Sequence, residues 1–342
     1  MRHASLPDPL MPAAIEEYHC TDGPDALAEL VGRERPLILR GLVGHWPAVA
    51  WARASDTAFA RGLAALDNGH EVDALLLPPG EDGCIGYSAD LAAFNYEHYR
   101  VSVTDGLKQL AHVSRKRDPP GIAMQSALIA ECLPGFLADH ALPLLDPSIQ
   151  PRLWVGNRVT TPAHFDEFHN IASVVCGSRR FTLFAPEQVC NLYIGPLDFA
   201  PTGAAISMAR LDRPDDPRFP RLKLALAQAQ VAELQPGDAI YIPPMWWHHV
   251  ASLGPLNALV NYWWKPALDA GPASGLGALM HAILAFRSLS PAERAAWRGL
   301  LDYYAFDAAD AAEHIPAARR GLLGTLTPEQ AAALREKIRR YL

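Results

Sequence analysis

The stretch T-P-A-H-F-D-E-F-H-N, residues 161–170, contains two potential metal ligands, His164 and Asp166, two positions apart. If this stretch is a β-strand or the end of one, both side chains project from the same face, because alternate strand residues share a face. A distant W-W-H-H run offers a third ligand. Consecutive strand residues point to opposite faces, so only one of its two histidines should bind the metal, and we favour His248 over His249. Two histidines and one carboxylate form the facial triad that holds Fe(II) and leaves positions open for a co-substrate and O₂.

The sequence around this stretch has a pattern typical of β-proteins. Beyond Pro151, short apolar runs rich in β-branched and aromatic residues alternate with Gly and Pro, and the triplet Pro236-Gly237-Asp238 indicates a turn between two of them. Such a series predicts an all-β sandwich or barrel. The expected strands are residues 153–159, 171–175, 180–184, 231–234, 239–242, 249–252 and 258–264.

The remaining segments predict flanking helices. A Pro- and Asp-rich segment at residues 190–230 is too long for a hairpin loop, so we expect a functional lid or insertion. In the Ala- and Leu-rich C-terminal part, Thr327 is expected to cap a helix with Pro328 at its first position. Expected helices are 26–31, 103–113, 128–137, 222–228, 275–288, 291–304 and 328–341; expected strands outside the β-rich part are 36–40 and 72–77, with a turn at 41–47.

Composition bounds the possible functions. The chain has 342 residues, of which 50% are apolar and 20% charged, an ordinary globular balance. A net charge of −7 gives no general attraction to nucleic acid or anionic lipid. The five cysteines are scattered and odd in number, which argues against a disulfide framework and a structural zinc site. Without a long apolar run, we expect a soluble, cytoplasmic protein with neither a nucleic-acid nor a membrane partner.

Four ordered motifs resemble those of a known family. They are the 161–170 stretch itself, G-S-R-R-F-T-L-F-A-P at 177–186, L-Q-P-G-D-A-I-Y-I-P-P-M-W-W-H-H-V at 234–250, and N-Y-W-W-K at 261–265. Together with P-L-I-L-R-G-L-V-G-H-W-P-A at 36–48, they resemble the cupin-like JmjC family of Fe(II)- and 2-oxoglutarate-dependent oxygenases, and within it the asparaginyl hydroxylases.

This resemblance implies a mainly β fold, with a double-stranded β-helix (jelly-roll, or cupin) core, flanking N-terminal helices and a C-terminal helical segment. We expect a cupin-like JmjC domain over residues 1–268, made of an α/β part (1–150) and the jelly-roll core (151–268). Residues 269–342 would form a C-terminal helical region. In the hydroxylases that the chain resembles, such C-terminal helices form a homodimer, so a homodimer is expected here.

Carried over residue by residue, the resemblance assigns the iron ligands to His164, Asp166 and His248. It implies 2-oxoglutarate as the co-substrate and O₂ as the oxidant. Its co-substrate contacts fall on Thr161, Asn170, Asn261 and Arg179, and Trp263 is expected to reach the site because it shares a face with Asn261.

Two positions depart from the hydroxylase pattern. Arg179 replaces a lysine that grips the far carboxylate of 2-oxoglutarate, and its planar guanidinium can pair with that carboxylate through two hydrogen bonds. The neighbouring Arg180 should face outward, although an exchange of roles is open. Ala123 falls where the hydroxylases have a tyrosine that contacts the same carboxylate, so one hydrogen bond is lost or comes from elsewhere.

The leading function is therefore an oxygenase, most simply a hydroxylase of a protein or peptide side chain or of a small molecule. Because the triad suits several divalent ions, a cupin with Zn²⁺ or Mn²⁺ and isomerase or lyase activity is an alternative. A binding module that has kept the fold and lost turnover is a third class. The sequence does not identify the substrate, and we expect the insertion at 190–230 to select it.

Overall fold

The computed structural model describes residues 13–19, 25–265, 274–307 and 311–341. The chain divides into two compact units, Met1–Trp264 and Lys265–Leu342.

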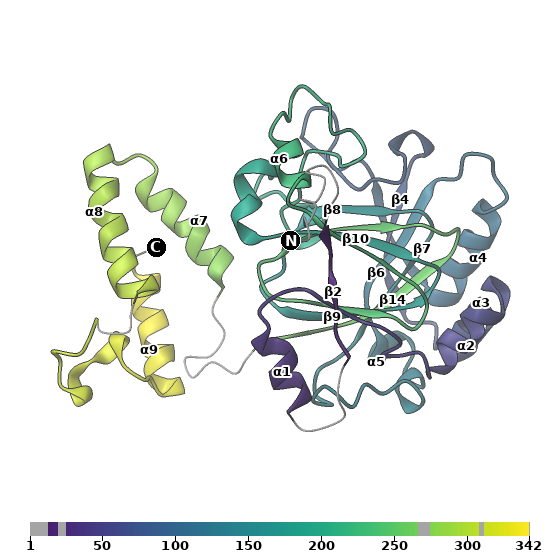
Figure 1. The fold of residues 1–342 in the computed structure, drawn as a ribbon, viewed down its shortest axis with the longest axis horizontal. Helices are drawn as coiled ribbons and strands as arrows, with labels where there is room; N and C mark the ends of the chain where they lie inside the picture. Colours follow the sequence, from purple (N-terminus) through teal and green to yellow (C-terminus); the bar gives the residue numbers. More distant parts are fainter. Residues whose placement is uncertain (1–12, 20–24, 266–273, 308–310, 342) are drawn as a thin grey trace, which may run out of the picture. The chain divides into compact units, whose positions relative to one another are not determined.

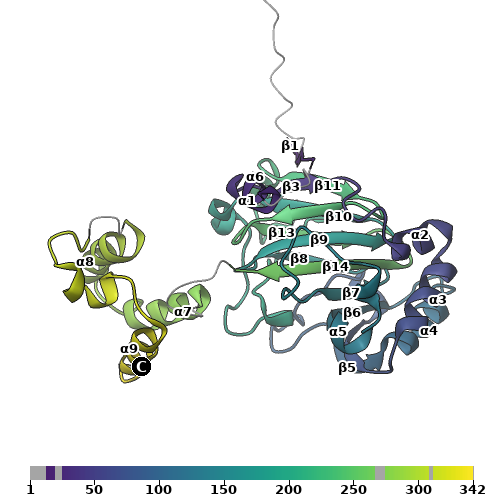
Figure 2. The same cartoon turned by 90° about the horizontal axis from the view of Figure 1, so that it is seen from below.

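The first unit is built on two β-sheets (Figures 1 and 2). The strands are β1 (Ala13–Ala14), β2 (Glu16–Glu17), β3 (Leu37–Leu39), β4 (Glu71–Leu77), β5 (Glu97–Ser102), β6 (Gly121–Leu128), β7 (Arg152–Gly156), β8 (Thr160–His164), β9 (His169–Cys176), β10 (Arg179–Phe184), β11 (Gln230–Leu234), β12 (Ala239–Ile242), β13 (Trp247–Ser252) and β14 (Asn257–Trp264). The larger sheet has the order β2-β3-β12-β9-β14-β7-β6-β4-β5, and the smaller one β1-β11-β10-β13-β8.

Strands β7 to β14 form a double-stranded β-helix. Along the chain they pass back and forth between the sheets, so that β12-β9-β14-β7 faces β11-β10-β13-β8. Inward-pointing apolar side chains, among them Val174, Phe181, Leu183, Ile240 and Leu259, fill the space between the two layers. The predicted fold class, a jelly-roll core with flanking helices, is therefore confirmed.

A tight turn between β11 and β12 fixes the register of the core. Gly237 has a φ of +109°, a conformation that glycine adopts at little cost, and its N–H donates to the Val174 carbonyl. Asp238 accepts hydrogen bonds from the backbone N–H groups of Gly41 and Gln235. The turn predicted from the Pro-Gly-Asp triplet is present.

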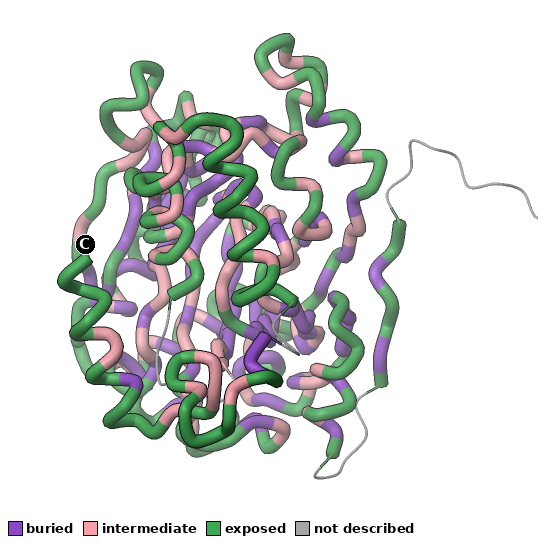
Figure 3. The backbone as a smooth tube through the Cα atoms, turned by 90° about the vertical axis from the view of Figure 1, so that its left-hand side faces the viewer, coloured by how far each residue is buried: buried purple, intermediate pink, exposed green. Residues whose placement is uncertain are grey.

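Helices flank the sheets of the first unit. They are α1 (Ala26–Gly32), α2 (Pro47–Ala54), α3 (Asp56–Leu66), α4 (Val103–Val113) and α5 (Ile129–Cys132). Of these, α2, α3 and α4 are grouped on one side and α1 lies on the other (Figure 2). The sequence did not indicate α2 or α3, and the helix predicted at 128–137 is wrong beyond α5, because Pro134 interrupts the helical hydrogen bonding. In Figure 3 buried residues concentrate along the strands, and exposed residues lie mainly on helices and loops.

Strand β8 forms one edge of the smaller sheet, and other segments cover that edge. The N–H of Thr160 donates to the Gly83 carbonyl at 2.8 Å, and the N–H of Ile85 donates to the Thr160 carbonyl at 3.0 Å. The N–H of Ser207, in the predicted insertion, donates to the Ala163 carbonyl at 2.7 Å. The insertion contains the short helix α6 (Leu222–Leu226), where a helix was expected.

The second unit contains the three predicted C-terminal helices: α7 (Gly275–Phe286), α8 (Pro291–Leu301) and α9 (Pro328–Arg339). The Thr327 side chain accepts from the N–H of Gln330, whose own side chain accepts from the N–H of Thr327, so the predicted cap is confirmed. None of the described helices is long and apolar enough to cross a bilayer. Cys84, Cys132, Cys176 and Cys190 have free thiols, and Cys20 lies outside the described residues.

Candidate metal centre

Three side chains with metal-binding atoms converge between the sheets. His164 ends β8, Asp166 follows it, and His248 lies on β13 directly opposite His164. One potential ligand atom from each lies within 4.8 Å of the others. His248 Nε2 is 3.6 Å from Asp166 Oδ2, and the two imidazole centroids are 4.2 Å apart. His249 pairs with Thr182 on the opposite face of the sheet, as expected.

An irregularity in β8 brings Thr161 to the same face as His164. Residue His248 pairs with His164 and Val250 with Thr161, so three steps along β8 match two along β13. Residues paired across an antiparallel ladder share a face, and a bulge absorbs the extra residue. The expected co-substrate residue Thr161 therefore faces the interior although it is an odd number of positions from His164.

Backbone hydrogen bonds orient both imidazoles. The Nδ1 atom of His164 lies 2.9 Å from the Pro162 carbonyl, and that of His248 lies 3.0 Å from the Trp246 carbonyl. Because a carbonyl can only accept, Nδ1 is the donor, and in a neutral ring Nε2 is then the nitrogen with the lone pair. Burial, with a smaller contribution from His164, lowers the pKa of His248 against the opposing effect of Asp166. Neutral imidazole is the form that binds metals.

The carboxylate of Asp166 is oriented by a tryptophan. The indole N–H of Trp263, a residue expected to reach the site, donates to Asp166 Oδ2 at 3.1 Å. The Asp166 carbonyl accepts from the backbone N–H of Met245 at 2.8 Å, which fixes the loop that carries the carboxylate. Trp263 therefore contacts a triad member directly.

The two predicted asparagines are also brought together. Trp154 donates its indole N–H to Asn261 Oδ1 at 2.8 Å, and Asn261 Nδ2 donates to Asn170 Oδ1 at 3.2 Å. Both asparagines are buried. The sequence did not single out Trp154, and alternation within β7 would have been the only indication that it faces the site.

Arg179 is a partly buried cation that lacks an acidic partner among the described residues. Its Nε atom has no hydrogen-bond partner, and Nη2 reaches only the Trp154 carbonyl at 3.5 Å. Burial lowers the pKa of Arg179 to about 10. Arg180, in contrast, is exposed and donates two hydrogen bonds to Glu233 at 2.8 and 2.5 Å. Of the two arginines, Arg179 is the one with capacity left for an anionic ligand.

Ala123 packs in a small apolar cluster with Leu77, Ile85 and Val159. This residue supplies no hydroxyl where the hydroxylases have one. The donor set for an anion at this end therefore rests on the Arg179 guanidinium.

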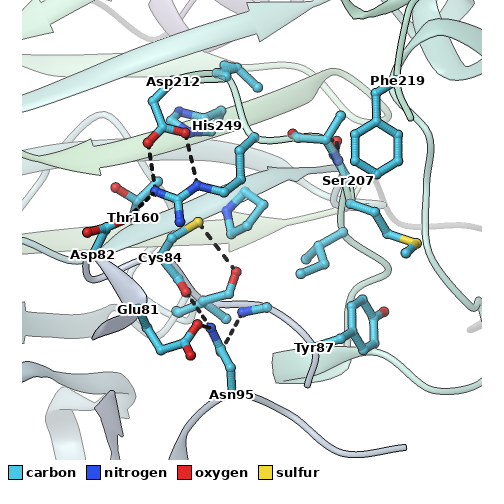
Figure 4. Close-up of a pocket in the computed structure, with 18 of the residues that line it drawn as sticks. Glu81, Asp82, Cys84, Tyr87, Asn95, Thr160, Ser207, Asp212, Phe219 and His249 are labelled. Carbon is cyan, nitrogen blue, oxygen red and sulfur yellow. Dashed lines mark hydrogen bonds and ion pairs between the residues drawn. The ribbon is translucent and has the colours of Figure 1, made fainter. Parts of the chain in front are cut away.

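A cavity of about 530 Å³ lies on the other face of β8, β10 and β13 (Figure 4). Its floor includes Thr160, Thr182 and His249. Burial lowers the pKa of His249 to about 4. Its walls come from residues 81–95 and from the insertion at 206–219, and its lining does not include the triad. The sequence predicted a role for the insertion but not for residues 81–95, which carry no motif.

Comparison with known proteins agrees with this geometry. Residues 24–270, well over half of the chain, match the family model described as "Cupin-like domain". The chain is 36% identical over 119 residues to Jumonji C domain-containing protein 5 of Drosophila melanogaster. The matched segment covers 34% of this chain and 28% of the fly protein. It is 33% identical over 113 residues to human HSPB1-associated protein 1 (32% of this chain, 22% of that protein).

A third relative is the lysine-specific demethylase JMJ31 of Arabidopsis thaliana, 34% identical over 113 residues, or 33% of this chain and 20% of the plant protein. The matched segments thus span less than a third of each of these three relatives. The family model, however, covers the whole double-stranded β-helix and all the converging residues described above. The chain therefore belongs to the cupin-like JmjC family.

Proposed function

We propose that this protein is an Fe(II)- and 2-oxoglutarate-dependent oxygenase, most simply a hydroxylase. The observation that carries the proposal is a pair of complementary sites between the two sheets. One is the triad His164, Asp166 and His248, with both histidine Nε2 atoms available. The other is the partly buried Arg179, whose Nε atom is buried without a hydrogen-bond partner and whose charge has no acidic partner among the described residues.

The donor set fits the implied metal. Two neutral imidazoles and a carboxylate on one side of an ion are the ligands of non-haem Fe(II) oxygenases. When bound, Fe(II) would supply the activation of O₂ that couples decarboxylation of 2-oxoglutarate, to succinate and CO₂, with oxidation of a substrate C–H bond.

The residues of the chain would bind and orient the co-substrate. Arg179 would pair with its far carboxylate, and burial would strengthen that pairing by excluding water. Thr161, Asn170 and Asn261 would hold the end nearer the metal through hydroxyl and amide hydrogen bonds. These assignments leave the mouth of the β-helix for the substrate.

The substrate we propose is a protein or peptide side chain, by analogy with the hydroxylases that the chain resembles. A small molecule remains the alternative. One relative is named a lysine-specific demethylase. Oxidation of an N-methyl carbon belongs to the same reaction class, so it falls within this proposal. The net charge of −7 favours neither nucleic acid nor membrane as a partner.

The decisive assay measures succinate formed from 2-oxoglutarate in the presence of Fe(II), O₂ and candidate peptides. We expect the wild type to bind 2-oxoglutarate when loaded anaerobically with Fe(II), and His164→Ala to lose both metal and turnover. A wild type that binds a divalent ion but never binds 2-oxoglutarate would favour the isomerase or lyase alternative. Binding of both without turnover on any substrate would favour a non-catalytic module.

A further inference from the structure

Asp166 is held differently from the two histidines of the triad. His164 and His248 lie on β8 and β13, and the Nδ1 atom of each imidazole is hydrogen-bonded to the backbone carbonyl two residues earlier in the chain. Asp166 lies beyond the end of β8, where no ladder restrains its side chain. A carboxylate in a loop can rotate about its Cβ–Cγ bond, and such torsions are broad. Its orientation must therefore come from a neighbour.

That neighbour is Trp263, on β14 of the larger sheet. Its indole N–H lies 3.1 Å from Asp166 Oδ2, the oxygen that is also 3.6 Å from His248 Nε2. A hydrogen bond to an ionised carboxylate is roughly twice as strong as one between neutral groups. The indole N–H has no acceptor lone pair, so it can only donate and always favours the charged carboxylate.

The indole itself is fixed. Trp263 pairs with Asn170 in the ladder between β14 and β9, so its backbone cannot shift without breaking the larger sheet. Its ring meets that of Trp154 edge to face, with centroids 5.9 Å apart at 88°. Trp154 in turn donates to Asn261. The indole that donates to Asp166 therefore packs against the hydrogen-bonded group formed by Trp154 and the two asparagines.

The next residue provides a contrast. Trp264 projects to the other face of β14, where its ring stacks on His169 with centroids 5.2 Å apart at 19°. It is a tryptophan on the same strand, with similar packing and no contact with the triad. It is therefore a matched control for the loss of an indole.

We infer that Trp263 is a positioning residue that sets the orientation of the Asp166 carboxylate toward the metal. This inference rests on the proposed function, because it assumes that the triad binds a divalent ion. Neighbours that orient a metal ligand typically change metal affinity 10- to 100-fold when they are removed. Loss of the indole N–H should therefore lower the affinity for the metal directly, and any effect on co-substrate binding should follow from the weaker metal binding.

The test compares wild type, Trp263→Phe and Trp264→Phe, each stripped of metal with a chelator and titrated with Co²⁺. Co²⁺ binding is followed by its ligand-field absorption, which reports both affinity and coordination geometry. For Trp263→Phe we expect about a 10-fold or larger rise in the Co²⁺ dissociation constant and a changed absorption spectrum. For Trp264→Phe, both should match the wild type.

The outcomes separate the inference from the proposed function. If the wild type binds Co²⁺ and Trp263→Phe binds it with the same affinity and spectrum, the positioning role is excluded. If the wild type binds no Co²⁺ at all, the proposed metal site fails instead. Thermal denaturation of each metal-free variant checks folding. Should Trp263→Phe not fold, Trp263→Met takes its place, since methionine fills irregular space flexibly and also lacks the N–H.

Discussion

At the scale of single residues, the most informative group is Arg179, because its position costs stability. A guanidinium that is partly withdrawn from water without an acid beside it is unfavourable, and its lowered pKa has that cause. Such a residue is retained for binding. Replacing Arg179 should therefore weaken ligand binding and at the same time raise the stability of the folded protein.

Arg179→Met should weaken 2-oxoglutarate binding by roughly one to two orders of magnitude, the value of hydrogen bonds to a charged group. The same change should raise the free energy of unfolding of the metal-free protein, because an uncompensated buried charge is removed. Anaerobic titration of the Fe(II) form with 2-oxoglutarate and urea denaturation measure the two effects.

The control is Arg180→Met, which removes only the exposed ion pair with Glu233. Its effect on unfolding should stay below about 1 kcal/mol, and 2-oxoglutarate binding should not change. If Arg180→Met weakened co-substrate binding and Arg179→Met did not, the roles of the two arginines would have to be exchanged.

His140 gives a prediction about pH. Its Nδ1 donates to the Phe136 carbonyl at 2.7 Å, and its Nε2 accepts from the N–H of Ala48 in the first turn of α2 at 2.9 Å. Burial lowers the pKa of His140 below its usual 6.5. Above pH 6.5 the His140 imidazole is mostly neutral in both the folded and the unfolded state. Below that pH, this imidazole takes up a proton in the unfolded state more readily than in the folded state.

The free energy of unfolding should therefore fall as the pH decreases below about 6.5. His140→Phe should be less stable than wild type at pH 7 but should lose less stability between about pH 7 and 5. Urea denaturation at several pH values compares the slopes. Other buried histidines contribute to the wild-type slope, so the comparison between the two proteins is decisive; parallel curves would contradict the assignment.

At the scale of elements, the strands of the jelly roll could be predicted because short apolar runs between Gly and Pro punctuate them. Helices α2 and α3 could not. Gly62 lowers the helix propensity of α3, yet a Cβ there would lie 2.1 Å from the Trp51 ring, so packing between the two helices requires the glycine. Tertiary packing overrides local propensity at this position.

The candidate site shows a similar division. Local motifs brought out His164, Asp166 and His248, whose ligand atoms the structure places together. The bulge in β8 depends on its pairing with β13. The lack of a partner for Arg179 depends on the absence of an acidic side chain among the described residues around it. Neither is encoded in the spacing of residues along the chain. The walls at 81–95 meet the sheet only through tertiary contacts.

Gly156 offers a test of how closely β6 and β7 pack. A Cβ at this position would lie 2.5 Å from the Ile122 carbonyl oxygen, a backbone atom that can move only with its strand. Gly156→Ala should lower the free energy of unfolding by about 1–3 kcal/mol, as overpacking typically does.

Gly80→Ala is the matched control, because an added Cβ there meets nothing within 4 Å. Its effect on unfolding should stay within about 0.5 kcal/mol. Urea denaturation of both variants decides the question. Equal stability of the two would show that β6 and β7 can separate at little cost.

At the scale of the whole molecule, the second unit has large apolar side chains on its surface. Leu284 is 80% exposed and Phe306 76%, and all the side chains of α7 are at least partly accessible. Exposed apolar patches of this kind mark association sites. We propose that the occupant is a second copy of this chain, as expected from the resemblance.

Sedimentation velocity should therefore give the mass of a dimer. Leu284→Glu combined with Phe306→Glu should shift it to the monomer, because a charge placed in an apolar interface is costly. Leu224→Glu, at an exposed apolar position on α6, controls for added charge and should leave the mass unchanged. A monomeric wild type would refute the proposal.

The covered edge of β8 has a consequence for the fate of the protein in a concentrated solution. An uncovered edge strand is a template for strand addition by another chain, the first step toward amyloid. Here Gly83, Ile85 and Ser207 occupy the outward backbone groups of β8. The segments that build the cavity wall thus also occupy the edge of the sheet, and shortening them to open that wall would expose β8 to strand addition by another chain.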